Sequence, residues 1–190
     1  MSGYDAVKRL VSSISAMRET YDHHGARVAE LAVKLATAAG LSAQQVELIE
    51  TGAHLHDIGK VLIRRELLNA PRKLTDSEVI EMQTHSMLGW AIVEQALFEP
   101  EICDVVRHHH ERYDGNGYPD HLQMQQIPLA ARVVTLCDNY EALISRRTYR
   151  EAYSPAFART YMQAGKGIQF DPDLTDLFFS QVISEKVKDT

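Results

Sequence analysis

Apolar residues repeat at intervals of three and four along nearly the whole chain, and this spacing is the feature that most constrains its fold. Val28, Leu31 and Leu35 form one such stripe, which ends at Gly40. A further stripe begins after Ser42, a residue suited to cap a helix. No segment alternates apolar and polar residues as a half-buried strand would. The chain is therefore predicted to fold as a single compact bundle of α-helices.

The same spacing places helices along the rest of the sequence. An N-terminal helix is expected over 4–19, and the third helix is expected to end near Gly59. Thr75 and Glu78 form the pattern of a capping box, which predicts a helix start there. Further helices are expected over 76–84, 86–97, 100–110, 127–144, 155–164 and 172–187. Turn-forming residues interrupt the pattern over 113–128, so an irregular loop is expected in that segment.

Composition excludes several classes of protein. The 190 residues are 45% hydrophobic and 24% charged, as in an ordinary globular domain rather than a disordered or fibrous chain. No apolar run reaches the roughly 18 residues of a membrane-spanning helix, and residues 1–19 lack the apolar core of a signal peptide. The net charge of −6 argues against binding to nucleic acid or to a membrane surface. Two cysteines, Cys103 and Cys137, suit a reducing cytoplasm.

Histidine is the unusual component, with 9 residues. Three are adjacent, at 108–110, on a polar helix end where packing would rarely select them. His85 shares the inward face of its predicted helix with Met82 and Leu88. Asp138 lies within an apolar helix, where a carboxylate must be paired, hydrogen-bonded or bound to a cation. Imidazoles with a few carboxylates suit Fe, Mn, Zn or Co better than Ca or Mg. A metal site in the bundle is therefore predicted, the alternative being histidines that only form hydrogen bonds.

Several short motifs together resemble the HD-GYP branch of the HD phosphohydrolases. They are His56-Asp57-Ile58-Gly59-Lys60, His109-His110-Glu111 with Asp114-Gly115-Asn116-Gly117-Tyr118-Pro119, His24-Gly25-Ala26-Arg27, Met82-Gln83-Thr84-His85, Ile127-Pro128-Leu129-Ala130-Ala131-Arg132 and Phe170-Asp171-Pro172. The resemblance spans residues 10–185. It implies an all-α domain of the HD type with an irregular GYP loop over residues 20–190. Residues 1–19 are then interpreted as a helix that remains from a linker.

The resemblance implies a cytoplasmic bacterial enzyme that hydrolyses cyclic di-GMP to pGpG or GMP through a hydroxide that bridges two metal ions. The family's ligand pattern falls on His24, His56, Asp57, His85, His109, His110 and Asp138. By that pattern, His24, His56, Asp57 and Asp138 hold one ion, and Asp57 bridges to a second ion held by the remaining histidines. Iron or manganese is expected, with zinc, nickel, cobalt and magnesium as alternatives. Thr20 stands where members with a third metal carry a glutamate, which favours two ions.

The resemblance also suggests which residues act on the substrate. Asp57 and Lys60 are the expected catalytic residues. Lys60 could reach the scissile phosphate or protonate the leaving 3′ oxygen, the alternative being a cation at a helix C-terminus. Arg147 and Arg150 stand where the family uses basic residues to bind the dinucleotide, and guanidinium groups suit phosphate oxygens. The turn at 115–119 would line the pocket, bind a partner, or serve only to shape the backbone.

Two other functions stay open from the sequence alone. The chain could be a catalytically weak receptor for cyclic dinucleotides that binds partner proteins. It could also be a phosphohydrolase for another nucleotide, such as cyclic GMP-AMP. Expected partners are a diguanylate cyclase, receiver or sensor domains, and a second copy of the chain in a homodimer. Because about twenty residues precede the helix of His24, the chain is expected to be a stand-alone member or an excised domain.

Overall fold

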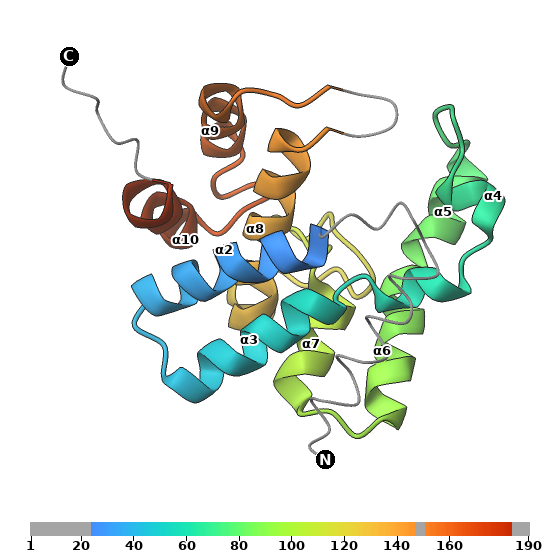
Figure 1. Cartoon of the computed structure of the whole chain (residues 1–190), viewed down its shortest axis with the longest axis horizontal. Helices are drawn as coiled ribbons and strands as arrows, with labels where there is room; N and C mark the ends of the chain where they lie inside the picture. Colours follow the sequence, from blue (N-terminus) through green and yellow to red (C-terminus); the bar gives the residue numbers. More distant parts are fainter. Residues whose placement is uncertain (1–23, 147–150, 184–190) are drawn as a thin grey trace.

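The structure is a computed structural model that describes residues 24–146 and 151–183. Within these residues the secondary-structure elements are all helices (Figure 1). With the labels of Figure 1, these are α2 (His24–Ala38), α3 (Ala43–Leu55), the 3-10 helix η1 (Ile58–Leu62), α4 (Arg65–Leu68), α5 (Asp76–Gln83), α6 (His85–Gln95), α7 (Pro100–His108), the 3-10 helix η2 (Met124–Gln126), α8 (Leu129–Ile144), α9 (Pro155–Ala164), α10 (Pro172–Leu177) and the π-helix η3 (Phe178–Val182). The predicted all-α fold is confirmed. No helix among the described residues is long and apolar enough to span a membrane. The helix expected over 4–19 lies outside the described residues.

Two helices begin at the capping residues that the sequence indicated. The Ser42 side chain accepts a hydrogen bond from the backbone of Gln45, and the Gln45 side chain in turn accepts one from the backbone of Ser42. Thr75 and Glu78 form the same reciprocal pair at the start of α5. Each pair satisfies two backbone N–H groups that lack partners inside the helix, and such a cap contributes about 1 kcal/mol.

Two predicted helix ends are wrong, and tertiary packing explains one of them. The third helix ends at Leu55 instead of near Gly59, and the chain continues through Asp57 into η1. The change from an α-helix to a 3-10 helix allows η1 to pack against α6. The last helix was expected over 172–187, but α10 keeps α-helical geometry only to Leu177 and then widens into η3.

The hydrophobic core joins α2, α3 and α8 to the C-terminal helices. Its buried residues include Val28, Ala32, Leu35, Ile49, Val133, Val134, Leu136, Tyr140, Phe178 and Phe179. A second cluster of Leu55, Ile58, Val93, Ile102, Cys103 and Val106 joins α3 and η1 to α6 and α7. Each fully buried large side chain contributes about 1.5–3 kcal/mol. The two clusters therefore fix the relative positions of the elements that carry the predicted ligands.

Gly59 allows η1 and α6 to approach at backbone distance. A Cβ atom at this position would lie 1.9 Å from the carbonyl oxygen of His85 and 2.5 Å from the amide nitrogen of Gly89. Both neighbours are main-chain atoms, so rotation of a side chain could not make room, and only glycine fits. This close approach places His85, the first residue of α6, beside Asp57, which directly precedes η1.

Candidate metal centre

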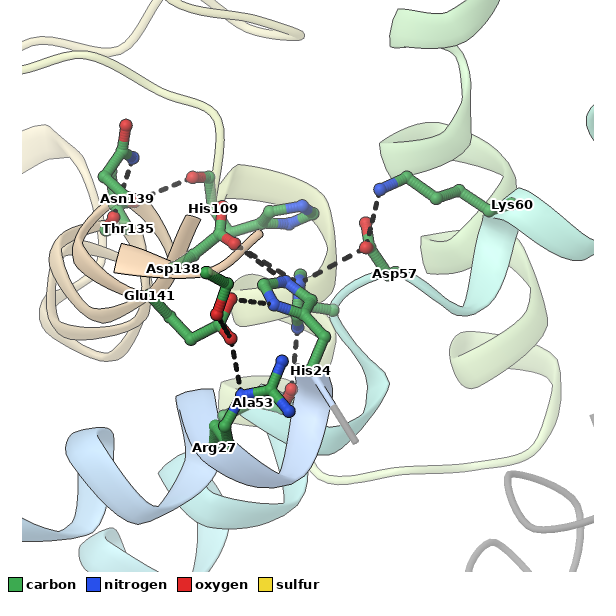
Figure 2. Close-up of polar contacts among 12 residues, drawn as sticks. His24, Arg27, Ala53, Asp57, Lys60, His109, Thr135, Asp138, Asn139 and Glu141 are labelled. Atoms are coloured by element: carbon green, nitrogen blue, oxygen red, sulfur yellow. Dashed lines mark hydrogen bonds and ion pairs between the residues drawn. The ribbon is translucent and has the colours of Figure 1, made fainter. Parts of the chain in front are cut away.

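The seven predicted ligands come from separate elements and meet in the centre of the bundle. His24 begins α2, His56 and Asp57 lie between α3 and η1, His85 begins α6, His109 and His110 follow α7, and Asp138 lies in α8. Figure 2 shows His24, Asp57, His109 and Asp138 close together, contributed by segments far apart in the sequence. The structure thus brings together the whole predicted set.

One group of ligand atoms consists of Asp57, His85, His109 and His110. One atom from each side chain lies within 4.8 Å of the others. The His85 Nε2 atom is 3.4 Å from Asp57 Oδ1 and 3.3 Å from His109 Nε2. His85 and His109 are 1% and 0% exposed, so these two rings are shielded from solvent.

A second group consists of His24, His56 and Asp57, whose ligand atoms also lie within 4.8 Å of one another. Asp138 adjoins this group, because its Oδ1 atom is 3.0 Å from His24 Nε2 and 3.9 Å from His56 Nε2. The Asp138 side chain is 14% exposed and paired, as expected for a carboxylate on an apolar helix. Asp57 belongs to both groups and therefore lies between them.

Backbone carbonyls orient three of the histidine rings. The Nδ1 atoms of His56, His85 and His109 lie 2.7, 2.8 and 3.0 Å from the carbonyl oxygens of Ala53, Met82 and Val106. A carbonyl oxygen only accepts hydrogen bonds, so each Nδ1 atom donates its proton there. In the neutral rings the lone pair is then on Nε2, the atom that faces the centre, which is the usual arrangement of metal-binding histidines.

The residues present fit a metal. His56 Nε2 and Asp57 Oδ1 are buried without a hydrogen-bond partner, and such an atom costs about 1–3 kcal/mol when unsatisfied. The Nε2 lone pairs of His85 and His109 face each other at 3.3 Å, an arrangement of two acceptors that is unfavourable without a cation. Imidazole nitrogens and carboxylate oxygens are the donor set of divalent transition-metal ions. The cluster could therefore hold metal.

Burial and charge keep these groups in the protonation states of metal ligands. Burial lowers the pKa of His85, holds that of His109 well below its usual value, and lowers that of His110 to about 3. Burial would raise the pKa of Asp57, but the positive charge of Lys60 outweighs it and holds the pKa well below the ordinary value. The three imidazoles are therefore neutral and the shared carboxylate ionised at neutral pH.

His24 has a different environment. Burial lowers its pKa, but the hydrogen bonds that it donates to Asp138 and Glu141 outweigh burial and raise the pKa to about 9. These two carboxylates contact opposite edges of the ring, Asp138 at Nε2 and Glu141 at Nδ1. His24 thus links the metal-facing edge of α8 to the start of α2.

The irregular loop after α7 lines the site. The Tyr118 ring stacks on the His110 ring at a centroid distance of 4.9 Å, and its backbone N–H donates to the His110 carbonyl at 3.3 Å. Gly117 makes this path sterically allowed, because a Cβ atom there would lie 2.3 Å from the amide nitrogen of Arg112 and 2.5 Å from the Cα atom of Glu111. Of the three roles considered for this turn, the structure shows both the lining of the site and the shaping of the backbone.

Among the other predicted site residues, Lys60 donates from Nζ to Asp57 Oδ2 at 2.6 Å (Figure 2). It reaches the centre from η1. Arg147 and Arg150 lie outside the described residues. His108, the first of the three adjacent histidines, was not predicted as a ligand, and its Nε2 atom lies 2.9 Å from Asp120.

Sequence analysis missed Glu141. Its carboxylate contacts His24 and accepts a hydrogen bond from Arg27 Nε at 2.6 Å, and only 2% of its side chain is exposed. Glu141 follows Asp138 by three residues, so the two carboxylates share one face of α8. That pairing was the signal in the sequence that could have identified it.

The chain is similar to known proteins along most of its length. Residues 9–174 match the HD domain family. A cyclic di-GMP phosphodiesterase response regulator of Xanthomonas campestris is 40% identical over 152 residues, which cover 79% of this chain and 40% of the relative. A 3′3′-cGAMP-specific phosphodiesterase of Vibrio cholerae is 32% identical over 177 residues, which cover 91% of this chain and 34% of the relative. This chain thus spans less than half the length of both relatives. A solved HDG"Y"P protein of Bdellovibrio bacteriovorus shares the fold, with a TM-score of 0.72 and 20% identity over 96% of this chain and 61% of that one.

Proposed function

This chain belongs to the HD domain family, and we propose that it is a metal-dependent phosphodiesterase that hydrolyses cyclic di-GMP to linear pGpG or to GMP. The observation that carries the proposal is the position of Asp57, whose carboxylate is shared by two groups of histidines. The names of the two curated relatives, one for cyclic di-GMP and one for cGAMP, support a cyclic dinucleotide as the substrate class.

In this proposal the two groups hold two divalent ions. His24, His56 and Asp138 would bind one ion, His85, His109 and His110 would bind the other, and Asp57 would bridge them. When bound, the ions would lower the pKa of a water molecule and neutralise charge on the phosphodiester. Iron or manganese fits this mixture of imidazole and carboxylate, and zinc, nickel, cobalt or magnesium are the alternatives.

The chain's own residues would bind and orient the phosphodiester. The Lys60 ammonium, 2.6 Å from Asp57 in this structure, lies where it can contact a phosphate oxygen beside the shared carboxylate. Water attacks phosphorus, the bond from phosphorus to the 3′ oxygen breaks, and that oxygen takes a proton, for which Lys60 is the proposed donor. Arg147 and Arg150 are proposed to bind the rest of the dinucleotide by bidentate hydrogen bonds. Because Tyr118 stacks on His110, its ring is proposed to form a wall beside the substrate.

The experiment that tests this function is anaerobic incubation of the purified chain with cyclic di-GMP and Fe(II) or Mn(II), followed by chromatography of the nucleotides. We expect pGpG or GMP to form, and a chelator to abolish their formation. Cyclic GMP-AMP, assayed in parallel, distinguishes the second candidate substrate that the Vibrio relative suggests. Verified metal binding without hydrolysis of either nucleotide would contradict the proposal and favour a receptor for cyclic dinucleotides.

The place of action and the partners are part of the same proposal. We propose a bacterial cytoplasm, in agreement with the two cysteines, Cys103 and Cys137, both of which are buried free thiols. A diguanylate cyclase, receiver or sensor domains and a second copy of the chain remain the proposed protein partners. The division of the chain into 1–19 and 20–190 likewise stays a prediction.

A further inference from the structure

We propose that Glu141 positions His24 for metal binding by holding the ring proton on Nδ1. The inference rests on the proposed metal centre and adds a residue that acts through a ligand without itself contacting the ion. Glu141 lies in α8 and His24 begins α2, so the contact joins two helices that pack together in the core (Figure 2).

Donors on both sides hold the Glu141 carboxylate in place. One of its oxygens, Oε2, accepts a hydrogen bond from His24 Nδ1. The other, Oε1, accepts hydrogen bonds from Arg27 Nε at 2.6 Å and from the Ser145 hydroxyl at 2.5 Å. With a side chain only 2% exposed, the carboxylate is oriented by these partners and shielded from water.

His24 differs in this respect from three of the other histidine ligands. In His56, His85 and His109 the Nδ1 proton is held by the carbonyl of the residue three positions earlier. In His24 a side chain from another helix performs this role, and the Nε2 atom faces Asp138 Oδ1 at 3.0 Å. A carboxylate is also a stronger acceptor than a carbonyl and raises the basicity of the bound ring.

A carboxylate is required because both of its oxygens must accept. In a Glu141→Gln variant one oxygen is replaced by an NH₂ group. The remaining oxygen stays with the two donors Arg27 and Ser145, so the NH₂ group faces His24 Nδ1. Because two donors cannot face each other, the ring then has no acceptor for the Nδ1 proton, which it must keep when Nε2 gives up its own proton to bind a metal ion. The proton on Nε2, which Asp138 accepts, is therefore harder for a metal ion to displace.

The test measures metal binding and the position of the ring proton in Glu141→Gln and the wild type. Zn²⁺ is titrated calorimetrically, bound ions are counted by mass spectrometry, and histidine tautomers are observed by two-bond ¹H–¹⁵N NMR at the Zn²⁺ concentration that just fills both wild-type sites. The matched control is Glu30→Gln, the same substitution at an exposed position of α2 that pairs only with Lys34 among the ion pairs described.

We expect the wild type and Glu30→Gln to bind two ions with His24 protonated at Nδ1. Glu141→Gln should bind one ion normally and the other about 10–100-fold more weakly, so that at the Zn²⁺ concentration that just fills the wild-type sites its His24 stays without metal and keeps a proton on Nε2. Glu141→Asp keeps two accepting oxygens and should recover the Nδ1 tautomer, which a merely structural role would not require. If circular dichroism showed that the glutamine variant does not fold, the aspartate variant would carry the test through its tautomer and affinity.

The outcomes separate this inference from the function on which it rests. Two ions bound by Glu141→Gln with wild-type affinity and an unchanged His24 tautomer would overturn the role of Glu141 alone. A wild-type chain that binds no ion would overturn both the proposed metal centre and the role of Glu141.

Discussion

Replacing Gly59 with alanine should separate η1 from α6 and thereby weaken the metal centre. The new Cβ atom would lie 1.9 Å from the His85 carbonyl oxygen, and it reaches ordinary contact at 3.4 Å only if the two backbones part by about 1.5 Å. Overpacking of a core lowers the free energy of unfolding by about 1–3 kcal/mol. Because the neighbours here are main-chain atoms, we expect a loss at the upper end of this range. For a domain of this size that corresponds to a fall in Tm of about 6–12 °C.

The same displacement moves His85 away from Asp57, from which its Nε2 atom is now 3.4 Å distant. A misplacement of about 1 Å can cost about 100-fold in rate, so hydrolysis should fall by about that factor even well below the melting temperature. The assays are thermal unfolding by circular dichroism, metal stoichiometry and product chromatography.

Gly165→Ala is the matched control for Gly59→Ala. Its Cβ atom would lie 2.9 Å from the Phe170 ring, a side-chain contact and not a main-chain one, at the C-terminal end of α9. It should lower Tm less and leave metal binding unchanged. A Gly59→Ala variant with wild-type Tm, metal content and turnover would refute the argument that this glycine joins the two halves of the site.

Three further predictions concern stability and metal. Asp171→Ala should lower the free energy of unfolding, measured in urea titrations, by about 3–5 kcal/mol. The substitution removes the ion-pair partner of the largely buried Arg132 and also removes the N-terminal cap of α10. Asp171→Asn keeps the cap and should therefore lose less stability. The hydrogen bond from Arg72 lowers the pKa of Glu78 to about 2. The stability advantage of the wild type over Glu78→Gln should therefore be complete above about pH 4.5 and shrink as the pH falls toward 2. Thermal melts at several pH values measure this difference. Removal of the bound metal by a chelator should lower Tm by several degrees, because ions at about 100-fold their Kd stabilise the folded state by about 2.7 kcal/mol. In His85→Ala, the chelator should lower Tm by less.

Local chemistry explains why much of the fold was predictable. The caps at Ser42 and Thr75 depend on residues within one helical turn, and the structure confirms both. The end of α3 depends instead on contact between η1 and α6, more than twenty residues further along the chain. A periodic pattern continues through Leu55 to Gly59 in the sequence, and only the packed backbone of α6 shows why the helix must end earlier.

The site shows the same division. His56-Asp57 and the adjacent histidines are visible as motifs, and the resemblance to a known family assigned each a place that the structure brings together. The spacing of Glu141 from Asp138 is visible in the sequence, but its contact with His24 is set by the packing of α8 against the start of α2, which no local pattern records. His108 likewise differs in role from the two histidines that follow it, because its ring pairs with Asp120 of the loop.

By itself, the sequence determined the helical class, the capped helix starts and the residue types of a metal centre, because these depend on spacing and side-chain chemistry along the chain. Only the tertiary structure decided that Asp57 is shared by two groups of histidines and that Glu141 holds His24. Those facts depend on distances between residues more than twenty positions apart. Such distances are set by how the buried faces of α2, α3, α6, α7 and α8 pack, and not by any one of those helices.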